Sequence, residues 1–212
     1  ISGTAPYSQE EIIAASGVKS GDNIIRMDTK KVEQNVLEKL VNVESVKVSR
    51  GFPAELKIEV TQCVPAANIE CGGKYFVISK QRKIIEENLS APKENLPVIY
   101  GFDAANPEMN KPANSNDSEK DQIVDEIMTT IGNLQFEKIN KIDVTDRLAI
   151  TLIYDNRINI RLGSRADLEY KTNFAKAIIH GENFPPSFQG DIIMREGGEA
   201  SVIEKSSNTS TK

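Results

Sequence analysis

Residues 43–60, with the sequence VESVKVSRGFPAELKIEV, decide the fold of the first third of the chain. Apolar and polar residues alternate on both sides of the Phe52-Pro53 pair, for example at Val46 and Val48 before it and at Ile58 after it. A period of two residues is typical of a strand with one buried and one solvent-exposed face. The stretch therefore predicts an antiparallel hairpin. A helix must cover its apolar face, because an isolated hairpin is marginally stable in water.

The residues before the hairpin predict two helices that can provide this cover. Ser8 stands three residues before Glu11, which is the spacing of a capping box, and the helix that begins there should end at Gly17. Asp28 or Thr29 caps a second helix, whose apolar residues share one side: Val32, Val36, Leu37 and Leu40. The short apolar run 23–27 predicts a strand between the helices. The expected order is helix, strand, helix, strand, strand.

The residues after the hairpin predict a larger unit, mostly of antiparallel strands, with helices. Its expected elements are, in order, a hairpin over 75–85, a helix from Asp117 or Ser118, a meander over 138–162 with a turn at Asp155-Asn156, a helix ending near His180, and strands at 191–195 and 200–204 that meet at Gly197-Gly198. Asp-Asn and Gly-Gly pairs favour two-residue turns because their residues tolerate positive φ.

This order of elements resembles the POTRA domain and the following β domain of the FtsQ/DivIB family of bacterial cell-division proteins. The resemblance covers roughly residues 4–204. The segments that carry it are Gly21-Asp22-Asn23-Ile24-Ile25, Val46-Lys47-Val48, Phe52-Pro53 with Leu56 and Ile58, Val64-Pro65-Ala66-Ala67, Gly73-Lys74-Tyr75-Phe76-Val77-Ile78, Arg161-Leu162-Gly163, and Gly190-Asp191-Ile192-Ile193. Their order and spacing over two domains are more specific than any one of them.

We therefore predict an α+β fold with two domains. Residues 1–65 form a POTRA-like domain of two helices on a three-stranded sheet, and residues 66–204 form the mostly antiparallel β domain with helices. Residues 103–120 are almost free of apolar side chains and predict a mobile surface loop. The polar tail 205–212 is expected to be disordered.

Composition excludes several classes of protein. The chain has 212 residues and a net charge of -5, whereas binding to a phosphate backbone requires a surplus of clustered basic side chains. No run reaches the ~18 apolar residues of a membrane helix, and the start has no signal-peptide pattern. The chain begins at Ile1 without a methionine, so we expect it to be part of a longer protein, from which any membrane anchor could have been cut away.

No catalytic, cofactor or metal constellation stands out in the sequence. His180 is the single histidine, and its place at a predicted helix end favours an interaction with the helix dipole over a role as a general base. Adjacent carboxylates such as Glu10 and Glu11 lack the apolar surroundings that raise a pKa. We therefore expect a protein that is not an enzyme and needs no cofactor and no metal.

Cys63 and Cys71 leave two alternatives open. Eight positions apart, they are candidates for a local disulfide outside the cytoplasm or for two free thiols. A disulfide closing so short a loop would stabilise the fold by roughly 2 to 3 kcal/mol.

The family resemblance implies a scaffold of the division machinery that binds partners outside the cytoplasm. It implies a single-pass membrane protein at the division septum that helps assemble and regulate septal wall synthesis. The POTRA domain would help localise it, and the last strands would pair with a partner of the FtsB/DivIC type in a complex with FtsL. An edge strand can bind in this way because its free amides and carbonyls accept an added strand.

The residues expected at the partner site lie on the last two strands and the preceding helix: Ile192, Ile193, Met194, Arg195, Glu196, Ala200, Val202, Ile203 and, more weakly, Lys171. The same apolar residues can instead be core positions, because alternate residues of a strand face inward. A charge placed at Met194 would separate these readings. The solvent face of the first hairpin, Lys47, Ser49, Lys57 and Glu59, is a secondary candidate.

Two other classes fit less well. One is a POTRA-type, chaperone-like module of protein secretion or outer-membrane assembly, which typically has several POTRA repeats, whereas this chain has one such unit. The other is an enzyme such as a wall hydrolase, for which the sequence provides no site.

Overall fold

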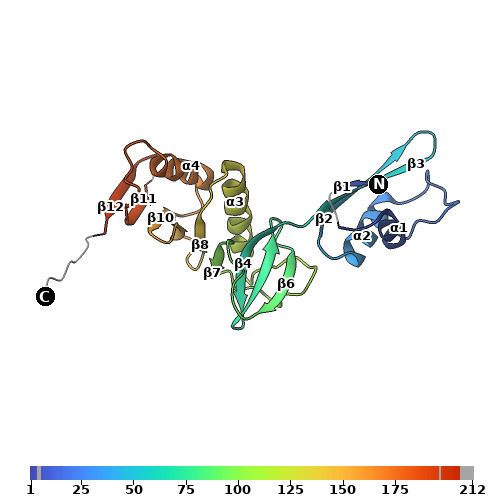
Figure 1. The fold of residues 1–212 in the computed structure, drawn as a ribbon, viewed down its shortest axis with the longest axis horizontal. Helices are drawn as coiled ribbons and strands as arrows, with labels where there is room; N and C mark the ends of the chain where they lie inside the picture. Colours follow the sequence, from blue (N-terminus) through green and yellow to red (C-terminus); the bar gives the residue numbers. More distant parts are fainter. Residues whose placement is uncertain (4–5, 196, 206–212) are drawn as a thin grey trace.

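The computed structural model describes residues 1–3, 6–195 and 197–205, which form two domains in an elongated arrangement (Figure 1). The N-terminal domain contains a three-stranded sheet and two helices, and the C-terminal domain contains a nine-stranded sheet and two helices. The predicted α+β class, with a POTRA-like domain before a larger β domain, is confirmed. The predicted tail lies outside the described residues except for Lys205.

The predicted hairpin forms β2 (Val43–Gly51) and β3 (Glu55–Gln62). Val46 pairs with Val60 and Val48 pairs with Ile58, so the apolar side chains of both strands face the same side. They pack against α1 (Gln9–Ser16) and α2 (Thr29–Lys39), and Val36 of α2 is fully buried there. The hairpin therefore obtains the helical cover that its alternation demands.

Both helices begin, and α1 ends, where their capping residues predict. Ser8 and Glu11 form the capping box, in which Glu11 N donates to Ser8 Oγ (3.2 Å) and Ser8 N donates to Glu11 Oε2 (2.8 Å). Gly17 ends α1 in the left-handed conformation, with φ of 75°. Asp28 caps α2 by accepting from Lys30 N.

The third strand of this sheet differs from the prediction. It is β1 (Ser2–Gly3), which runs parallel to β3, and not the apolar run 23–27. Asn23 Oδ1 accepts from Ile25 N (3.0 Å) and Arg26 N (3.3 Å), so the side chain holds that run in a turn. Local bonds of this kind compete with strand pairing. The observed order is strand, helix, helix, strand, strand.

The β domain is one mixed sheet in the order β12-β11-β10-β9-β8-β7-β4-β5-β6. Its strands are β4 (Pro65–Cys71), β5 (Lys74–Ser79), β6 (Ile84–Leu89), β7 (Val98–Tyr100), β8 (Ile139–Asp143), β9 (Ile150–Tyr154), β10 (Ile158–Gly163), β11 (Gly190–Met194) and β12 (Ala200–Glu204). Five of its eight pairings are antiparallel. Two of the three parallel pairings, β7 with β8 and β10 with β11, follow from helical crossovers through α3 (Ser118–Leu134) and α4 (Leu168–Ile179).

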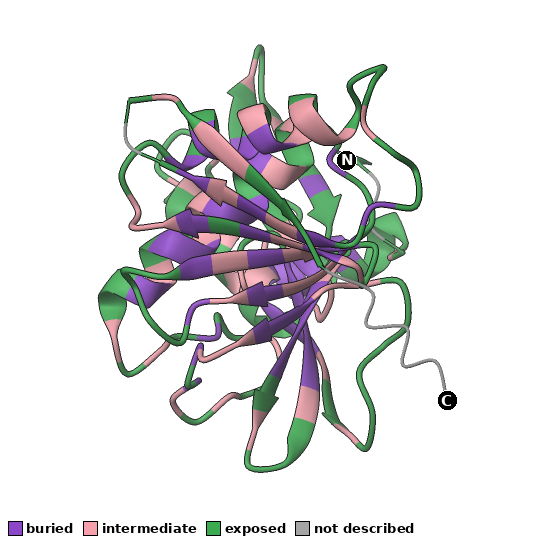
Figure 2. Cartoon of the chain, turned by 90° about the vertical axis from the view of Figure 1, so that its left-hand side faces the viewer, coloured by how far each residue is buried: buried purple, intermediate pink, exposed green. Residues whose placement is uncertain are grey.

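Helices α3 and α4 cover one face of this sheet, and the main core lies between the helices and the sheet (Figures 1 and 2). Along β10, Ile158 and Ile160 are fully buried on that face, whereas Arg161 is exposed on the other. Ile123 and Ile127 supply the buried side of α3. No helix within residues 1–3, 6–195 and 197–205 has both the length and the apolar content needed to cross a bilayer.

The segment 103–117, predicted as part of a mobile loop ending at 120, is anchored to the domain. Ala104 and Ala113 are buried, and Ala104 forms a bridge with Ser115. Ala113 N donates to Arg82 O at 2.7 Å. The helix α3 already begins at Ser118. Backbone hydrogen bonds and two buried alanines therefore hold a segment that has few apolar side chains.

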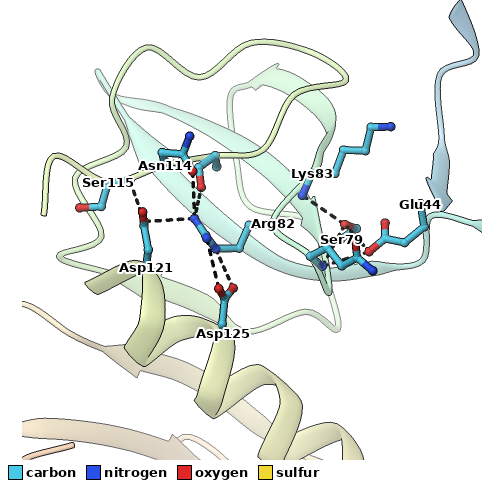
Figure 3. A network of polar contacts seen from close by, with 10 residues as sticks. Glu44, Ser79, Arg82, Lys83, Asn114, Ser115, Asp121 and Asp125 are labelled. Atoms are coloured by element: carbon cyan, nitrogen blue, oxygen red, sulfur yellow. Dashed lines mark hydrogen bonds and ion pairs between the residues drawn. The ribbon is translucent and has the colours of Figure 1, made fainter. Parts of the chain in front are cut away.

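A buried polar cluster joins the two domains (Figure 3). Glu44 lies where the register of β2 shifts, and such irregularities redirect a side chain. Its Oε1 accepts from Ser79 Oγ and from Gln81 N, both at 3.0 Å. Lys83 Nζ donates to Val43 O at 2.6 Å. The β5–β6 turn therefore binds the start of β2.

The same turn is tied to α3. Arg82 Nε donates to Asp125 Oδ1 at 2.6 Å, and its Nη1 lies 3.1 Å from Asp121 Oδ1 (Figure 3). Both ion pairs involve an arginine side chain that is largely buried. The turn thus connects the first domain to the helical layer of the second.

Candidate functional site

Strand β12 forms one edge of the nine-stranded sheet, at the end of the molecule away from the first domain (Figure 1). It pairs with β11 in antiparallel register, with Ile192 opposite Val202 and Met194 opposite Ala200. Within the described residues no strand pairs with its other side. Its outer side is therefore open to an added strand. At the other edge of the sheet, Ile84 of β6 exchanges backbone hydrogen bonds with Asn110 and Lys111.

Two hydrogen bonds at the ends of β12 define which backbone groups point outward. Lys205 N donates to Gln189 O at 2.8 Å, and Arg195 N donates to Glu199 O at 2.9 Å. Because bonded and non-bonded pairs alternate in an antiparallel ladder, Ser201 and Ile203 bond to β11. The amides of Val202 and Glu204 therefore point away from the sheet.

Two large apolar side chains stand exposed on this edge. Val202 has an exposed fraction of 46% and Ile203 one of 52%. They follow each other in a strand, so they project to opposite faces. Ala200 is partly buried and packs on the main core. An added strand would thus meet apolar surface on both sides of the edge.

The helical side of the edge includes a residue that the sequence reasoning missed, Tyr170. This side chain is exposed, and its ring stacks on Phe174 with centroids 6.0 Å apart. A Cβ on Gly198, in the β11–β12 turn, would lie 2.8 Å from Tyr170 Oη. The turn is thus in close contact with α4. The sequence signal was an aromatic pair four positions apart on the helix, which places both rings on one face.

The opposite face of the edge is polar. Asp191 accepts from Asn159 Nδ2 at 2.7 Å and from Arg161 Nη2 at 2.6 Å. A shallow cavity of about 490 Å³ opens there, and Ile203 and Glu204 contribute to its wall. This face offers charged and amide groups next to the exposed isoleucine.

The structure divides the predicted partner-binding residues into two groups. Val202, Ile203 and Arg195 are exposed, and Ile193 and Ala200 are partly buried, so all five line the surface around the edge. Glu196 lies outside the described residues.

The other three predicted residues have buried side chains. Ile192 and Met194 belong to the main core, and Lys171 is buried with its Nζ donating to Ser164 O at 3.2 Å. Direct contact of these side chains with a partner is thus excluded in this conformation. The alternation along β11 separates Ile192 and Met194 from Ile193.

The secondary surface on the first hairpin is exposed as the alternation predicts. Lys47 pairs with Glu59 and Ser49 with Lys57, and all four are exposed. Nothing among the described residues identifies a ligand for this surface, so its role stays a prediction.

The disulfide considered for Cys63 and Cys71 does not form, and both are free thiols. The extended strand β4 separates them, and seven residues of strand span about 23 Å, far beyond the reach of a disulfide. Cys63 is buried beside the domain junction, where burial and the neighbouring Glu44 carboxylate raise the pKa of its thiol to about 12.

His180 packs against a stacked pair of aromatic rings, and no partner of a catalytic kind is found for it in the described residues. Its ring meets those of Phe136 and Tyr154 edge to face, with centroids 6.2 and 6.5 Å apart. It follows the last residue of α4, as predicted. Across 1–3, 6–195 and 197–205 no three metal-ligating side chains gather in one place.

Comparison with known proteins identifies the family. The family model "POTRA domain, FtsQ-type" matches residues 1–62, and "Cell division protein FtsQ/DivIB, C-terminal" matches residues 67–191. "Cell division protein DivIB" of Clostridium botulinum strain Hall is 23% identical over 97% of this chain and 80% of its own length. "Cell division protein FtsQ" of Geobacter sp. strain M21 is 34% identical over 45% of this chain and 34% of its own length. The C-terminal model covers more than half of the chain, which therefore belongs to the FtsQ/DivIB family of cell-division proteins.

Proposed function

We propose that this chain is a non-catalytic scaffold of the bacterial division machinery that acts outside the cytoplasm. A single membrane helix preceding this region would anchor it at the division septum, where it would help assemble and regulate septal wall synthesis. The matched family is named for cell division and is not a family of enzymes, which supports the division role.

The open edge of β12 carries the binding part of the proposal. Its outward amides at Val202 and Glu204 can pair with an extended segment of a partner. Exposed Val202 and Ile203 would add apolar contacts on the two faces. The partner would be a division protein of the FtsB/DivIC type, bound together with FtsL. The POTRA domain would contribute to localisation.

Residue-resolved hydrogen exchange tests this mode of binding. A peptide from the partner protein should slow exchange at the amides of Val202 and Glu204, because an added strand would bond them. The amides of Ser201 and Ile203 already bond to β11 and serve as the matched control, with a smaller change. Equal protection at all four amides, or none, would contradict strand addition at this edge.

A separate observation tests the anchor. The region preceding Ile1 in the full-length protein should contain an apolar segment of about 20 residues. A full-length protein without one would contradict the proposed localisation and leave the strand-addition test intact.

A further inference from the structure

Two large apolar side chains project from the tip of the first domain, far from β12. Phe52, in the turn of the β2–β3 hairpin, has an exposed fraction of 95%, and Ile25, in the loop between α1 and α2, one of 83%. Figure 1 shows the hairpin at the end of the molecule opposite to β12. Removing both side chains from water would be favourable, so the pair is a candidate for an interaction site.

Arg50 holds the two segments together. Its Nε donates to Ile24 O at 2.9 Å and its Nη2 donates to Met27 O at 2.5 Å. Arg50 stands two residues before Phe52, and Ile24 stands directly before Ile25. The two apolar side chains are therefore presented by one connected tip, which we define as residues 19–31 and 50–57.

The charge of this tip is opposite to that of the whole chain. Its basic side chains outnumber its acidic ones by six to three, whereas the chain has a net charge of -5. All nine are exposed: Lys19, Arg26, Lys30, Lys31, Arg50 and Lys57 against Asp22, Asp28 and Glu55. Basic side chains around protruding apolar ones suit the surface of an anionic bilayer.

The direction of β1 places the tip on the side from which the chain enters the domain. β1 is parallel to β3, with Ser2 opposite Glu59, and β3 runs away from the hairpin turn. Residues preceding Ser2 therefore lie toward the turn. Along β3, the distance from Glu59, which is opposite Ser2, to Glu55 at the turn is about 13 Å. An anchor that precedes Ile1 would thus emerge on the same side as Phe52.

We infer that this tip is a membrane-contacting surface that inserts Phe52 and Ile25 into the headgroup region of an anionic bilayer. This orientation rests on the proposed anchor, but the lipid contact is a property of the tip itself. Both apolar side chains are largely exposed and basic side chains surround them, which suits insertion into an anionic lipid surface. Contact at the tip would leave the opposite end, with β12, directed away from the membrane.

The absence of tryptophan in the chain makes a clean test possible. A Phe52→Trp variant carries a single tryptophan at the tip. Its emission should shift to the blue when vesicles of equal parts phosphatidylglycerol and phosphatidylcholine are added, and lipids with brominated acyl chains should quench it. Leu148→Trp is the matched control, because Leu148 is 75% exposed in the β domain, and its emission should not change.

Single substitutions measure the contribution of each side chain. Phe52→Ser should lower partitioning onto the anionic vesicles about ten-fold and Ile25→Ser several-fold, as expected for partial burial of each apolar group. High salt and vesicles of phosphatidylcholine alone should both weaken binding. Unchanged melting temperatures would exclude unfolding as the cause.

The inference fails if Phe52→Trp shows no blue shift with anionic vesicles, or if Leu148→Trp shows an equal one. A shift that needs another division protein and not lipid would also overturn it and would assign the tip to a protein partner. Because the assay uses residues 1–212 alone, its failure leaves the anchor and strand-addition tests unaffected.

Discussion

Strands β2 and β12 are both edges of their sheets, but they are protected very differently. On β2 the outward amide of Val48 donates to Glu33 Oε1 at 2.7 Å, and Glu44 at its start binds the second domain. On β12 no side chain of the described residues bonds the outward amides. An occupied edge resists strand addition, whereas an open one invites it. The difference directs a partner strand to the β domain.

The largest effect is expected at Met194 of β11, the strand next to the open edge, and it tests whether this side chain faces the core. Met194→Arg should lower the free energy of unfolding by about 4 kcal/mol or more, because the side chain is buried and a charge there has no partner. Urea denaturation measures the loss. Ile193→Arg, at a partly buried position, is the matched control and should cost far less. Similar stability of the two variants would contradict the burial.

Met194 also marks the limit of the sequence prediction. The alternation in 43–60 identifies buried and exposed positions because its polar residues mark the face that is exposed to solvent. Residues 192–194, Ile-Ile-Met, are all apolar, so the pattern leaves open which of them faces inward. The structure decides this through α4, which covers the face of Ile192 and Met194.

Long-range features were beyond the sequence for a related reason. The parallel pairings and the cluster around Glu44 depend on residues far apart in the chain, such as Ser79 and Lys83, which no local period connects. By contrast, capping at Ser8 depends on neighbouring residues and was predicted correctly. The turn at Asp155-Asn156 was predicted in the right place, but three residues and not two connect the strands, because Tyr154 pairs with Ile158. The open edge of β12 was predicted through a family resemblance and not from periodicity.

The next prediction removes the open edge itself. Val202→Pro should weaken binding of the partner peptide about 100-fold, because proline offers no amide to an added strand and its ring obstructs pairing. The fold should be retained, since proline is tolerated at outward positions of edge strands. Titration calorimetry measures the affinity, and circular dichroism verifies the fold.

Ser201→Pro is the control for this change. The amide of Ser201 bonds to β11, so proline there should detach the edge and lower stability as well as binding. If both variants bound the peptide more weakly but kept their stability, the amide of Ser201 would not bond to β11, in contrast to the pattern described above.

A smaller effect is expected from opening the protected edge. Glu33→Ala removes the acceptor for Val48 N and should cost about 1 to 2 kcal/mol. It should also promote association between β2 edges, which sedimentation at increasing concentration would detect. Glu33→Gln keeps an acceptor oxygen, so it should lose less stability and associate less than Glu33→Ala. A monomeric, fully stable Glu33→Ala variant would show that the carboxylate does not protect this edge.

The smallest effect concerns the start of β2, which binds the second domain and where Cys63 lies beside Glu44. Its thiol pKa is raised from 9.0 to about 12, so over that range the folded protein holds a proton that the unfolded chain has released. Stability should therefore fall as pH rises from about 9 toward 12. Lys83 acts in the opposite sense, because burial lowers its pKa below 10.5 and stability rises once the folded protein alone has lost that proton.

Cys63→Ala separates the two contributions. Urea midpoints of wild type and variant, compared at neutral pH and at about pH 10, should show a smaller alkaline loss in the variant, because its unfolded chain no longer gains a thiolate at position 63. If both proteins lose the same stability, the thiol titrates alike in the folded and unfolded states. The contact between the two domains around Cys63 would then be open to solvent, and the start of β2 would be as exposed as the edge of β12.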